Sequence, residues 1–533
     1  MSCSKIFSGE LPELTYDILK YFKNDFSTLH SCILVNRLWC RLAIPLLWEN
    51  PFSKPTGNLN FIEICLDNLN GDLKTELNEY RIEDNLFPSN TLFNYPSLIK
   101  YLNTHTIFYS IYKWSEIAKK TLKPEKRYSY EVENFQKLIQ ILFFKLIIDN
   151  EANLHTLEIE LISRTWNSHF NNLLELILQN PNFIIHNVKN LTFYTRIHND
   201  STSDNTYMIA KNLILQLINL HQNLKKISLS FDINFLSYKS LLLTKDYNCS
   251  NTLNTITLCH VNFKDIINLD KIFDQLKVLE SVHLIYCYSL NNSFIQQIIN
   301  LNRPFKLKSL IIDSGSQIDD SSFQLLLRKC GGYLENFGSK FGVQSEILLE
   351  SIIKYCKNIK SLYLSEIKDQ IIYLLLDLIE NMKQSLNYLT ISVSGCENYI
   401  ECSSIILQNL GQVLPFKLEY LDLVLHIKMS DFEVFLKNSQ DTFIKKLLIN
   451  NFNDLKGQDI LSYIKEYIMK KKRVKYLAFE YSLESTSDDE DDENCNYKEL
   501  ASMKDEVEEF KLYGIKVLSH YGSWISFYEF TQD

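Results

Sequence analysis

Residues 306–365 read KLKSLIIDSGSQIDDSSFQLLLRKCGGYLENFGSKFGVQSEILLESIIKYCKNIKSLYLS and contain two successive copies of one pattern. In the first copy, Leu307, Leu310 and Ile312 are spaced as on one face of a strand. After a polar turn, Phe323 and Leu326 begin a run with helical spacing. A short strand that feeds a helix cannot bury its apolar edge without a neighbour of the same kind. The stretch therefore predicts one segment of an α/β solenoid.

The same strand signature, with apolar residues at relative positions 0, 3 and 5, recurs along most of the chain. Its copies begin at Leu154, Val188, Leu224, Leu253, Leu279, Leu307, Ile359, Leu386, Leu418, Ile444 and Val474, with a weaker copy at Leu334. From Leu224 onward, successive copies begin 25 to 32 residues apart. A recurrence this regular predicts that residues 151–482 form a strand–helix solenoid.

The central copies resemble leucine-rich repeats of the cysteine-containing subclass, which is found in many F-box proteins. The positions that carry this resemblance are Ile318, Asp319, Asp320, Phe323, Leu326, Cys330, Leu334 and Phe337, with KYCKNI at 354–359. The family uses an Asn or Cys at the strand end to satisfy backbone groups of the turn, and only Cys287 matches clearly. We expect the other turns to find different partners. The resemblance implies a horseshoe-shaped α/β solenoid.

Residues 10–52, ELPELTYDILKYFKNDFSTLHSCILVNRLWCRLAIPLLWENPF, predict a separate unit of three short helices. Pro12 suits the first turn of a helix, and Asp25 or Ser27 suits the cap of the second. The third helix is expected to stop at Pro45, since proline has no N–H to donate. The predicted domains are 1–52 as this unit, 53–150 as a helical connector, 151–482 as the solenoid, 483–496 as an acidic disordered loop and 497–533 as a cap.

The stretch 10–52 resembles the F-box over about forty residues. Its matching positions are LPEL at 11–14, Ile18, Leu19, Leu29, Val35, Asn36, Arg37, Trp39, Leu47 and Trp48. The resemblance implies docking onto a Skp-family adaptor and, through it, onto a cullin-RING (SCF) ubiquitin ligase. We expect the adaptor contacts to be Leu11, Pro12, Leu14, Ile18, Leu19, Leu29, Val35 and Trp39.

These apolar residues also fit an ordinary helical core. Forty residues lie near the lower limit for a core that stands alone, so something else must cover part of this set. An adaptor surface is one candidate, and the next segment of the same chain is the other. In the connector that follows, helices are expected around 62–69, 97–102 and 135–148, with aromatic residues in the core.

The composition favours a globular protein without membrane or nucleic-acid partners. The chain has 533 residues, 46% of them hydrophobic and 22% charged, and a net charge of −9. It shows no dense Lys/Arg face and no run of 18 uninterrupted apolar residues. Its twelve cysteines lack the paired close spacing of zinc sites or disulfide frameworks. We expect buried free thiols, no metal or other cofactor, and a cytoplasmic or nuclear location.

Alternation along the strands predicts which side chains face away from the helices. A partner site is predicted on that inner face, because tyrosines are enriched in protein contacts and several are expected on neighbouring strands. The proposed residues are His283, Tyr363, Tyr388, Tyr420, Asp422 and Tyr476. A sheet face that is merely solvated is the alternative.

No catalytic motif appears in the sequence. It contains no glycine-rich phosphate loop, no HExxH and no GxSxG, and the adjacent pair Cys259 and His260 would point to opposite faces of a strand. The leading hypothesis is a non-enzymatic substrate receptor that tethers the ligase at one end and holds a protein target on the repeats. The alternative is a leucine-rich-repeat scaffold that recruits no ligase.

Overall fold

The structure is a computed structural model in which the chain divides into two compact units, Met1–Asn254 and Thr255–Asp533. It describes residues 11–53, 59–69, 92–120, 128–161, 167–195, 212–230, 249–264, 268–312, 318–339, 346–393, 397–452, 457–482 and 497–520, apart from 24, 186, 215, 219, 222 and 368, together with 75, 77 and 80. The predicted acidic loop, 483–496, lies outside these residues, as do Trp524, Phe527 and Tyr528 of the predicted cap.

The first unit begins with three short helices, α2 (Pro12–Lys20), α3 (Phe26–Ile33) and α4 (Arg37–Trp48). The carboxylate of Asp25 caps α3 by accepting from the Thr28 N–H, at 3.1 Å. The side chain of Asn36 caps α4 by accepting from the Trp39 N–H, at 2.9 Å. Side-chain acceptors at these positions satisfy donors that a helix cannot pair internally.

The expectation that Pro45 ends the third helix is wrong, because α4 continues through it to Trp48. The three residues after the proline, Leu46, Leu47 and Trp48, are all buried. Burial of large apolar side chains contributes about 1.5 to 3 kcal/mol each, which offsets the hydrogen bond that proline removes.

The remainder of the first unit combines helices with the first strands. Its elements are α5 (Asn60–Asp67), the 3₁₀ helix η2 (Tyr95–Leu98), β1 (Tyr101–Asn103), α7 (Thr104–Ala118), α8 (Ser129–Asp149), β2 (Thr156–Leu161), α9 (Asn167–Gln179), α10 (Pro181–Ile185), β3 (Asn190–Thr195) and β4 (Lys226–Ser230). The helix expected over 97–102 is wrong. A 3₁₀ turn that begins at Tyr95-Pro96 occupies part of it, and β1 then pairs in parallel with β2.

The strands of the first unit place their signature residues side by side. Leu157 of β2 pairs with Leu191 of β3, which pairs with Ile227 of β4. All three are buried. Parallel strands lie about 4.8 Å apart, so residues in the same register position stack into one continuous apolar row.

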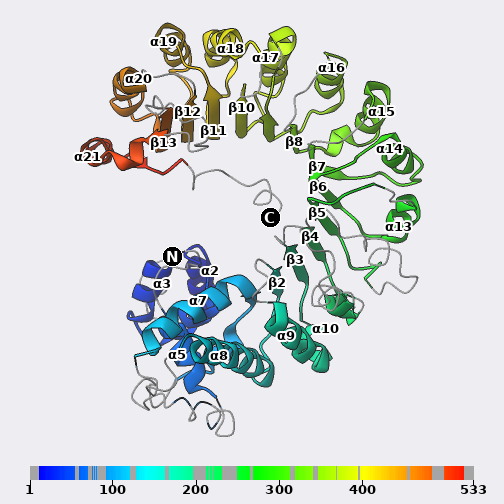
Figure 1. The fold of residues 1–533 in the computed structure, drawn as a ribbon, viewed down its shortest axis with the longest axis vertical. Coiled ribbons are helices and arrows are strands. Elements are labelled where there is room, and N and C mark those ends of the chain that lie inside the picture. The colour runs from blue at the N-terminus through cyan, green and yellow to red at the C-terminus, as the bar shows by residue number, and fades with distance from the viewer. Residues whose placement is uncertain are drawn as a thin grey trace. The chain divides into compact units, whose positions relative to one another are not determined.

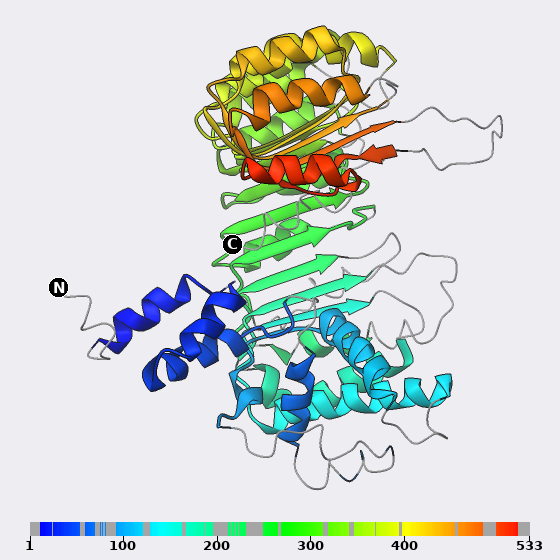
Figure 2. The ribbon, with the colours of Figure 1, turned by 90° about the vertical axis from the view of Figure 1, so that its left-hand side faces the viewer.

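In the second unit, the described strands from β5 to β13 are parallel and alternate with helices (Figures 1 and 2). The strands are β5 (Thr255–Cys259), β6 (Ser281–Cys287), β7 (Leu307–Ile312), β8 (Asn336–Ser339), β9 (Ser361–Leu364), β10 (Tyr388–Ser392), β11 (Lys417–Leu425), β12 (Phe443–Asn451) and β13 (Val474–Ser482). The helices between them are α13 (Leu269–Gln275), α14 (Asn292–Ile299), α15 (Asp320–Cys330), α16 (Glu346–Tyr355), α17 (Ile372–Asn381), α18 (Tyr399–Val413), α19 (Met429–Asn438) and α20 (Gly457–Tyr463).

Within this unit, the helices lie on the outer side of a curved run of strands (Figure 1). Phe337, Leu362, Leu389, Leu421, Leu447 and Leu477 share one register position from β8 to β13, and all are buried. The weak copy of the signature at Leu334 forms β8. The prediction of an α/β repeat with parallel strands is therefore confirmed.

The last strand, β13, is covered by elements from the C-terminal part of the unit. After it come β14 (Tyr497–Glu499), α21 (Lys504–Leu512) and β15 (Lys516–Val517). The strand β14 pairs antiparallel to the end of β13, and β15 pairs parallel to its start. These pairings occupy backbone groups that an edge strand would otherwise expose.

Buried side chains form hydrogen bonds with backbone groups of the turns at the strand ends. The thiol of Cys287 lies 3.4 Å from the Leu258 carbonyl oxygen, as the repeat pattern predicts. Asn451 takes the equivalent role at the end of β12, where its Oδ1 accepts from the Ile427 N–H at 2.8 Å. The sequence analysis missed this residue. The described cysteines are all free, and all but Cys40 are buried.

Gly411 sets the distance between helices α18 and α19. A Cβ atom there would lie 2.8 Å from the Phe435 carbonyl oxygen and 2.9 Å from the Asn438 Cβ. We expect Gly411→Ala to lower the free energy of unfolding by about 1 to 3 kcal/mol, because the helices must separate. Urea unfolding measures the loss. Gly332→Ala is the matched control, because no atom lies within 4 Å of its added methyl group.

The burial of His221 predicts that the protein loses stability in acid. It stands three residues before Leu224, as Cys356 stands before Ile359. It is fully buried, and its ring nitrogens have no hydrogen-bond partner among the described residues. Burial lowers the pKa of His221 to about 4. In the unfolded chain His221 is therefore protonated as the pH falls below 6.5, whereas in the folded chain it is protonated only near pH 4.

We expect this histidine to cost roughly 3 kcal/mol of stability as the pH falls from 7.5 to 4. Urea unfolding across this range measures the loss, and His221→Leu should reduce it. The exposed His30 provides the control substitution, His30→Ala, which should leave the pH dependence unchanged. Equal pH dependence in the wild type and His221→Leu would contradict the prediction.

Candidate protein-interaction sites

The apolar residues of the first three helices divide into an inward and an outward set. Leu19, Leu29 and Trp39 are buried inside the chain, with exposed fractions of 0%, 0% and 8%. They were expected to contact an adaptor, but in this structure they form the core between α2, α3 and α4. The reason is geometric, since α4 packs against both α2 and α3 and these side chains are buried by that packing.

The outward set keeps its apolar side chains in solvent. Leu14, Ile18 and Val35 are 42%, 37% and 51% exposed, whereas Leu11 and Pro12 are half-buried. The structure adds Tyr21 and Leu34, which are more exposed than any of these. We call Leu14, Ile18, Tyr21, Leu34 and Val35 the exposed apolar set. The spacing of Leu14, Ile18 and Tyr21 by four and three residues is the signal that Tyr21 shares their side of α2.

A buried carboxylate anchors these helices to the first strand. Glu49, directly after α4, forms ion pairs with Lys23 at 3.2 Å and with Lys100 at 3.6 Å. Its carbonyl oxygen also accepts hydrogen bonds from the N–H groups of Lys100 and Tyr101. Burial alone would lower the pKa of Lys23, but the attraction of Glu49 outweighs this effect and leaves that pKa raised.

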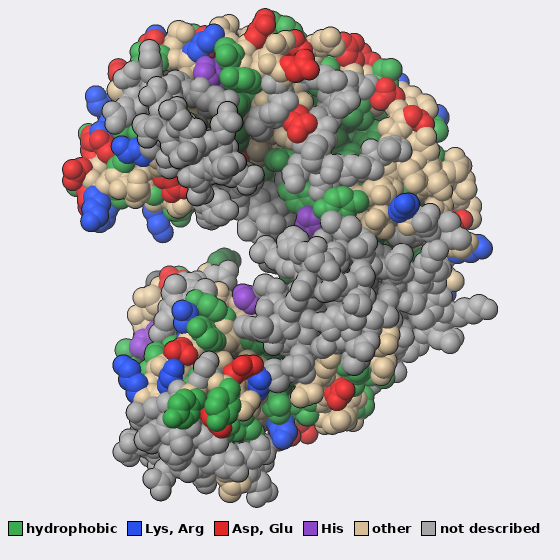
Figure 3. Space-filling view, in the orientation of Figure 1, with side chains coloured by type: hydrophobic (Ala, Val, Ile, Leu, Met, Phe, Trp, Pro, Cys, Tyr) green, Lys and Arg blue, Asp and Glu red, His purple; other side chains and the backbone are tan. Residues whose placement is uncertain are grey.

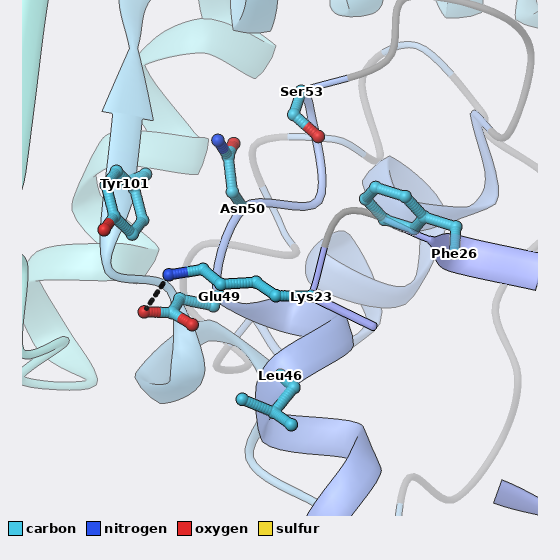
Figure 4. Close-up of a pocket in the computed structure, with 7 residues that line it drawn as sticks. All are labelled: Lys23, Phe26, Leu46, Glu49, Asn50, Ser53 and Tyr101. Carbon is cyan, nitrogen blue, oxygen red and sulfur yellow. Dashed lines mark ion pairs between the residues drawn. The ribbon is translucent and has the colours of Figure 1, made fainter. Parts of the chain in front are cut away.

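Lys23, Glu49 and Tyr101 line a cavity of about 300 Å³, together with Phe26, Leu46, Asn50 and Ser53 (Figure 4). The Lys23 ammonium lies 4.9 Å from the centre of the Tyr101 ring. The Glu49 carboxylate is already paired with Lys23 and Lys100. We therefore interpret this cluster as an anchor that holds the three helices in one orientation on β1.

On the second unit, the strands place the predicted inner-face residues in two rows. Tyr388, Tyr420 and Tyr476 share one row, in which Lys446 stands between Tyr420 and Tyr476. The rings of Tyr388 and Tyr420 lie 6.5 Å apart. Tyr363 was expected to continue this row, and that expectation is wrong. It pairs with Thr390, which pairs with Asp422, and so belongs to the next row.

Three of the six predicted contact residues are buried and not exposed. Tyr420 packs against Leu448 and Ala478 beneath Tyr388, and the Lys446 ammonium lies 5.5 Å from its ring centre. Asp422 accepts from the Tyr420 hydroxyl at 3.3 Å. Neighbouring strands bring these side chains so close that they cover one another. Tyr363, Tyr388 and Tyr476 remain half-exposed.

Burial raises the pKa of Asp422 to about 6, with His520, the Tyr420 hydroxyl and Lys446 acting in the opposite direction. The third buried residue, His283, has a structural role. Its Nδ1 lies 2.8 Å from the Ser309 Oγ, which also accepts from the Asn336 amide at 2.8 Å. This chain of hydrogen bonds joins β6, β7 and β8 across the inner face. Sequence reasoning missed Lys446 and Glu480, which the register of the strands brings to this surface, and His520, whose Nδ1 lies 3.0 Å from the Glu480 Oε2.

The structure places Cys259 at the end of β5 and His260 directly after it. Cys259 is buried against Ile285 and Ile311. His260 turns away at a φ of 54°, and its ring stacks on Tyr286 at 5.3 Å. Among the described residues, no group of three or more His, Cys, Asp or Glu side chains is placed to hold a metal ion. None of the described helices has the length and apolar character needed to span a membrane.

No family model matches the chain, and no curated protein sequence matches it. Among solved structures, the chain is similar to the leucine-rich repeat-containing protein LegL7 from Legionella pneumophila, with 12% identity and a TM-score of 0.33. That match covers 69% of this chain and 99% of LegL7. The repeat assignment therefore depends on the spacing and strand register described above.

Alanine substitutions in the inward and outward sets should lower the free energy of unfolding by very different amounts. We expect Leu29→Ala to lower the free energy of unfolding by about 2 to 5 kcal/mol, since it leaves a cavity in a small core. The exposed Leu34→Ala should change it by no more than about 0.5 kcal/mol. Urea unfolding followed by tryptophan fluorescence measures both. Equal losses for the two variants would show that the exposed apolar set is part of the core.

Proposed function

We propose that the chain is an F-box substrate receptor. Its first three helices dock onto a Skp-family adaptor of a cullin-RING (SCF) ubiquitin ligase, and its leucine-rich repeats hold a protein target. The protein itself performs no bond chemistry. It raises the concentration of the target beside the ubiquitin-transferring machinery, and proximity alone accelerates such transfer. This role places it in the cytosol or nucleus.

The exposed apolar set is the observation that carries the proposal. Leu14 and Ile18 stand one turn apart on α2, and Leu34 and Val35 occupy the turn between α3 and α4. Burying one such side chain contributes about 1.5 to 3 kcal/mol, so several together supply the affinity of a specific complex. A basic or acidic partner surface would not be favoured there, because the set carries no charge.

The target-binding half of the proposal is supported by the inner face of the second unit. Tyr363, Tyr388 and Tyr476 are half-exposed there, and Lys446 is the strand partner of Tyr476. Tyrosine supplies a large contact area and a polar tip while losing few rotamers, which suits protein recognition. On the face of the second unit seen in Figure 3, both acidic and basic side chains lie along the outer side.

A second candidate function is a leucine-rich-repeat scaffold that recruits no ligase. The burial of Leu19, Leu29 and Trp39 favours it, because these residues already have a structural role within the chain. In that case the three helices would serve as a cap on the first strands, and Glu49 would hold them in place.

The two functions separate in a binding experiment with the full chain and a purified Skp-family adaptor. We expect Leu14→Asp combined with Val35→Asp to weaken adaptor binding at least about a hundredfold, because charges would enter an apolar interface. Isothermal titration calorimetry measures the dissociation constant. Leu512→Asp is the matched control, since Leu512 is 85% exposed in the second unit and should leave binding unchanged.

Thermal unfolding of the same variants checks that they stay folded, as expected for substitutions of exposed residues. Failure of the wild-type chain to bind the adaptor would leave the scaffold as the function. Binding that survives the double substitution would move the docking site away from the exposed apolar set.

A further inference from the structure

The C-terminal end of the described chain places two side chains on the inner face of the last repeats. After β15, the Leu518 N–H donates to the Leu477 carbonyl oxygen at 2.8 Å and so continues the pairing with β13. The Leu518 side chain packs against a cluster formed by Tyr420, Leu448 and Ala478. This segment therefore occupies the surface that the repeats of the second unit offer to a partner.

Two residues further on, His520 meets an acidic site. Its Nδ1 lies 3.0 Å from the Glu480 Oε2, and the imidazole is 3% exposed. Asp422, on the neighbouring row, is also buried and interacts electrostatically with His520. Two buried carboxylates thus lie beside the imidazole, and the Lys446 ammonium also acts electrostatically on Asp422.

The site has more acceptors than its described donors fill. Asp422 Oδ2 accepts from the Tyr420 hydroxyl, and Glu480 Oε1 accepts from the Asn450 amide at 3.5 Å. Asp422 Oδ1 and Asn450 Oδ1 are buried and have no hydrogen-bond partner among the described residues. A buried acceptor without a donor costs about 1 to 3 kcal/mol, so an additional donor at this place is favourable.

We propose that this surface binds an extended segment of the target that carries an aliphatic residue and, two positions later, an arginine, and that Leu518 and His520 occupy the surface in its place. Residues two apart in an extended chain point to the same side, which matches the placement of the cluster and the carboxylates. A guanidinium offers five donors in a planar fork, whereas an imidazole offers two at most. The inference deepens the proposed target-binding role by naming the kind of segment recognised.

The test uses the full chain with Leu518→Asp and His520→Ala, which should displace its own segment. The probes are fluorescein-labelled peptides of residues 513–522, YGIKVLSHYG, and the same peptide with arginine or alanine at the position of His520. We expect the arginine peptide to bind the double variant at least about tenfold more tightly than the alanine peptide, measured by fluorescence anisotropy. It should bind the wild-type chain at least about tenfold more weakly than the double variant.

Adding Asp422→Asn to the double variant should remove the preference for arginine, since it removes a buried charge from the site. Asp377→Asn, on the exposed side of α17, is the matched control and should leave the preference intact. Equal binding of the three peptides, or no binding by a folded double variant, would overturn the proposal. Neither result bears on adaptor docking, which involves other residues and is measured separately.

A second measurement needs no peptide and no displacement. In the otherwise unchanged chain, His520→Arg should raise the melting temperature above that of His520→Ala by several degrees, because arginine would reach acceptors that the imidazole leaves empty. His30→Arg on the exposed side of α3 controls for the added charge. Equal melting temperatures for His520→Arg and His520→Ala would show that the site does not select a guanidinium.

Discussion

The structure depends on the stacking of equivalent aliphatic side chains from one repeat to the next. One strand and one helix leave an apolar edge open on each side, and only a neighbour with the same spacing can close it. Leu389, for example, has Leu362 on one side and Leu421 on the other at the same register position, and all three are buried. Each repeat thereby stabilises its neighbours within its unit.

This dependence on neighbours explains how the ends of the repeats are built. The last strand of the second unit has no further repeat beside it, and β14 and β15 pair with it instead. In the first unit, β1 is a strand of only three residues, and the chain before it is held in place by the ion pairs and hydrogen bonds of Glu49. In both units, short strands and polar contacts cover the end of the sheet, where no further repeat is present to continue the apolar row.

The same close stacking governs the surfaces available for recognition. On the inner face, strands about 4.8 Å apart force large side chains to cover one another, so a tyrosine such as Tyr420 becomes part of a buried layer. That layer holds carboxylates in a medium of low polarity, where a cation is strongly attracted. At the first three helices the geometry is reversed, because three short helices cannot enclose all their apolar residues and leave Leu34 and Val35 in solvent.

The repeat pattern and the helical start were predictable because they depend on local spacing. The spacing of Leu307, Leu310 and Ile312 predicts a strand. Asp25 and Asn36 are of residue types that commonly cap helices, and each lies within three residues of the N–H group that it caps. A local rule failed at Pro45, where packing of Leu46, Leu47 and Trp48 outweighed the preference of proline.

Only the tertiary structure decided which side chains are covered. Whether Asp422 meets solvent depends on Tyr420 beside it and on His520, almost one hundred residues further along the chain. Tyr363 and Tyr388 fall in different rows because the strand register, and not the spacing within either strand, sets the alignment. Burial arises from neighbours that the repeat brings together in space, and a pattern that is local in sequence carries no record of them.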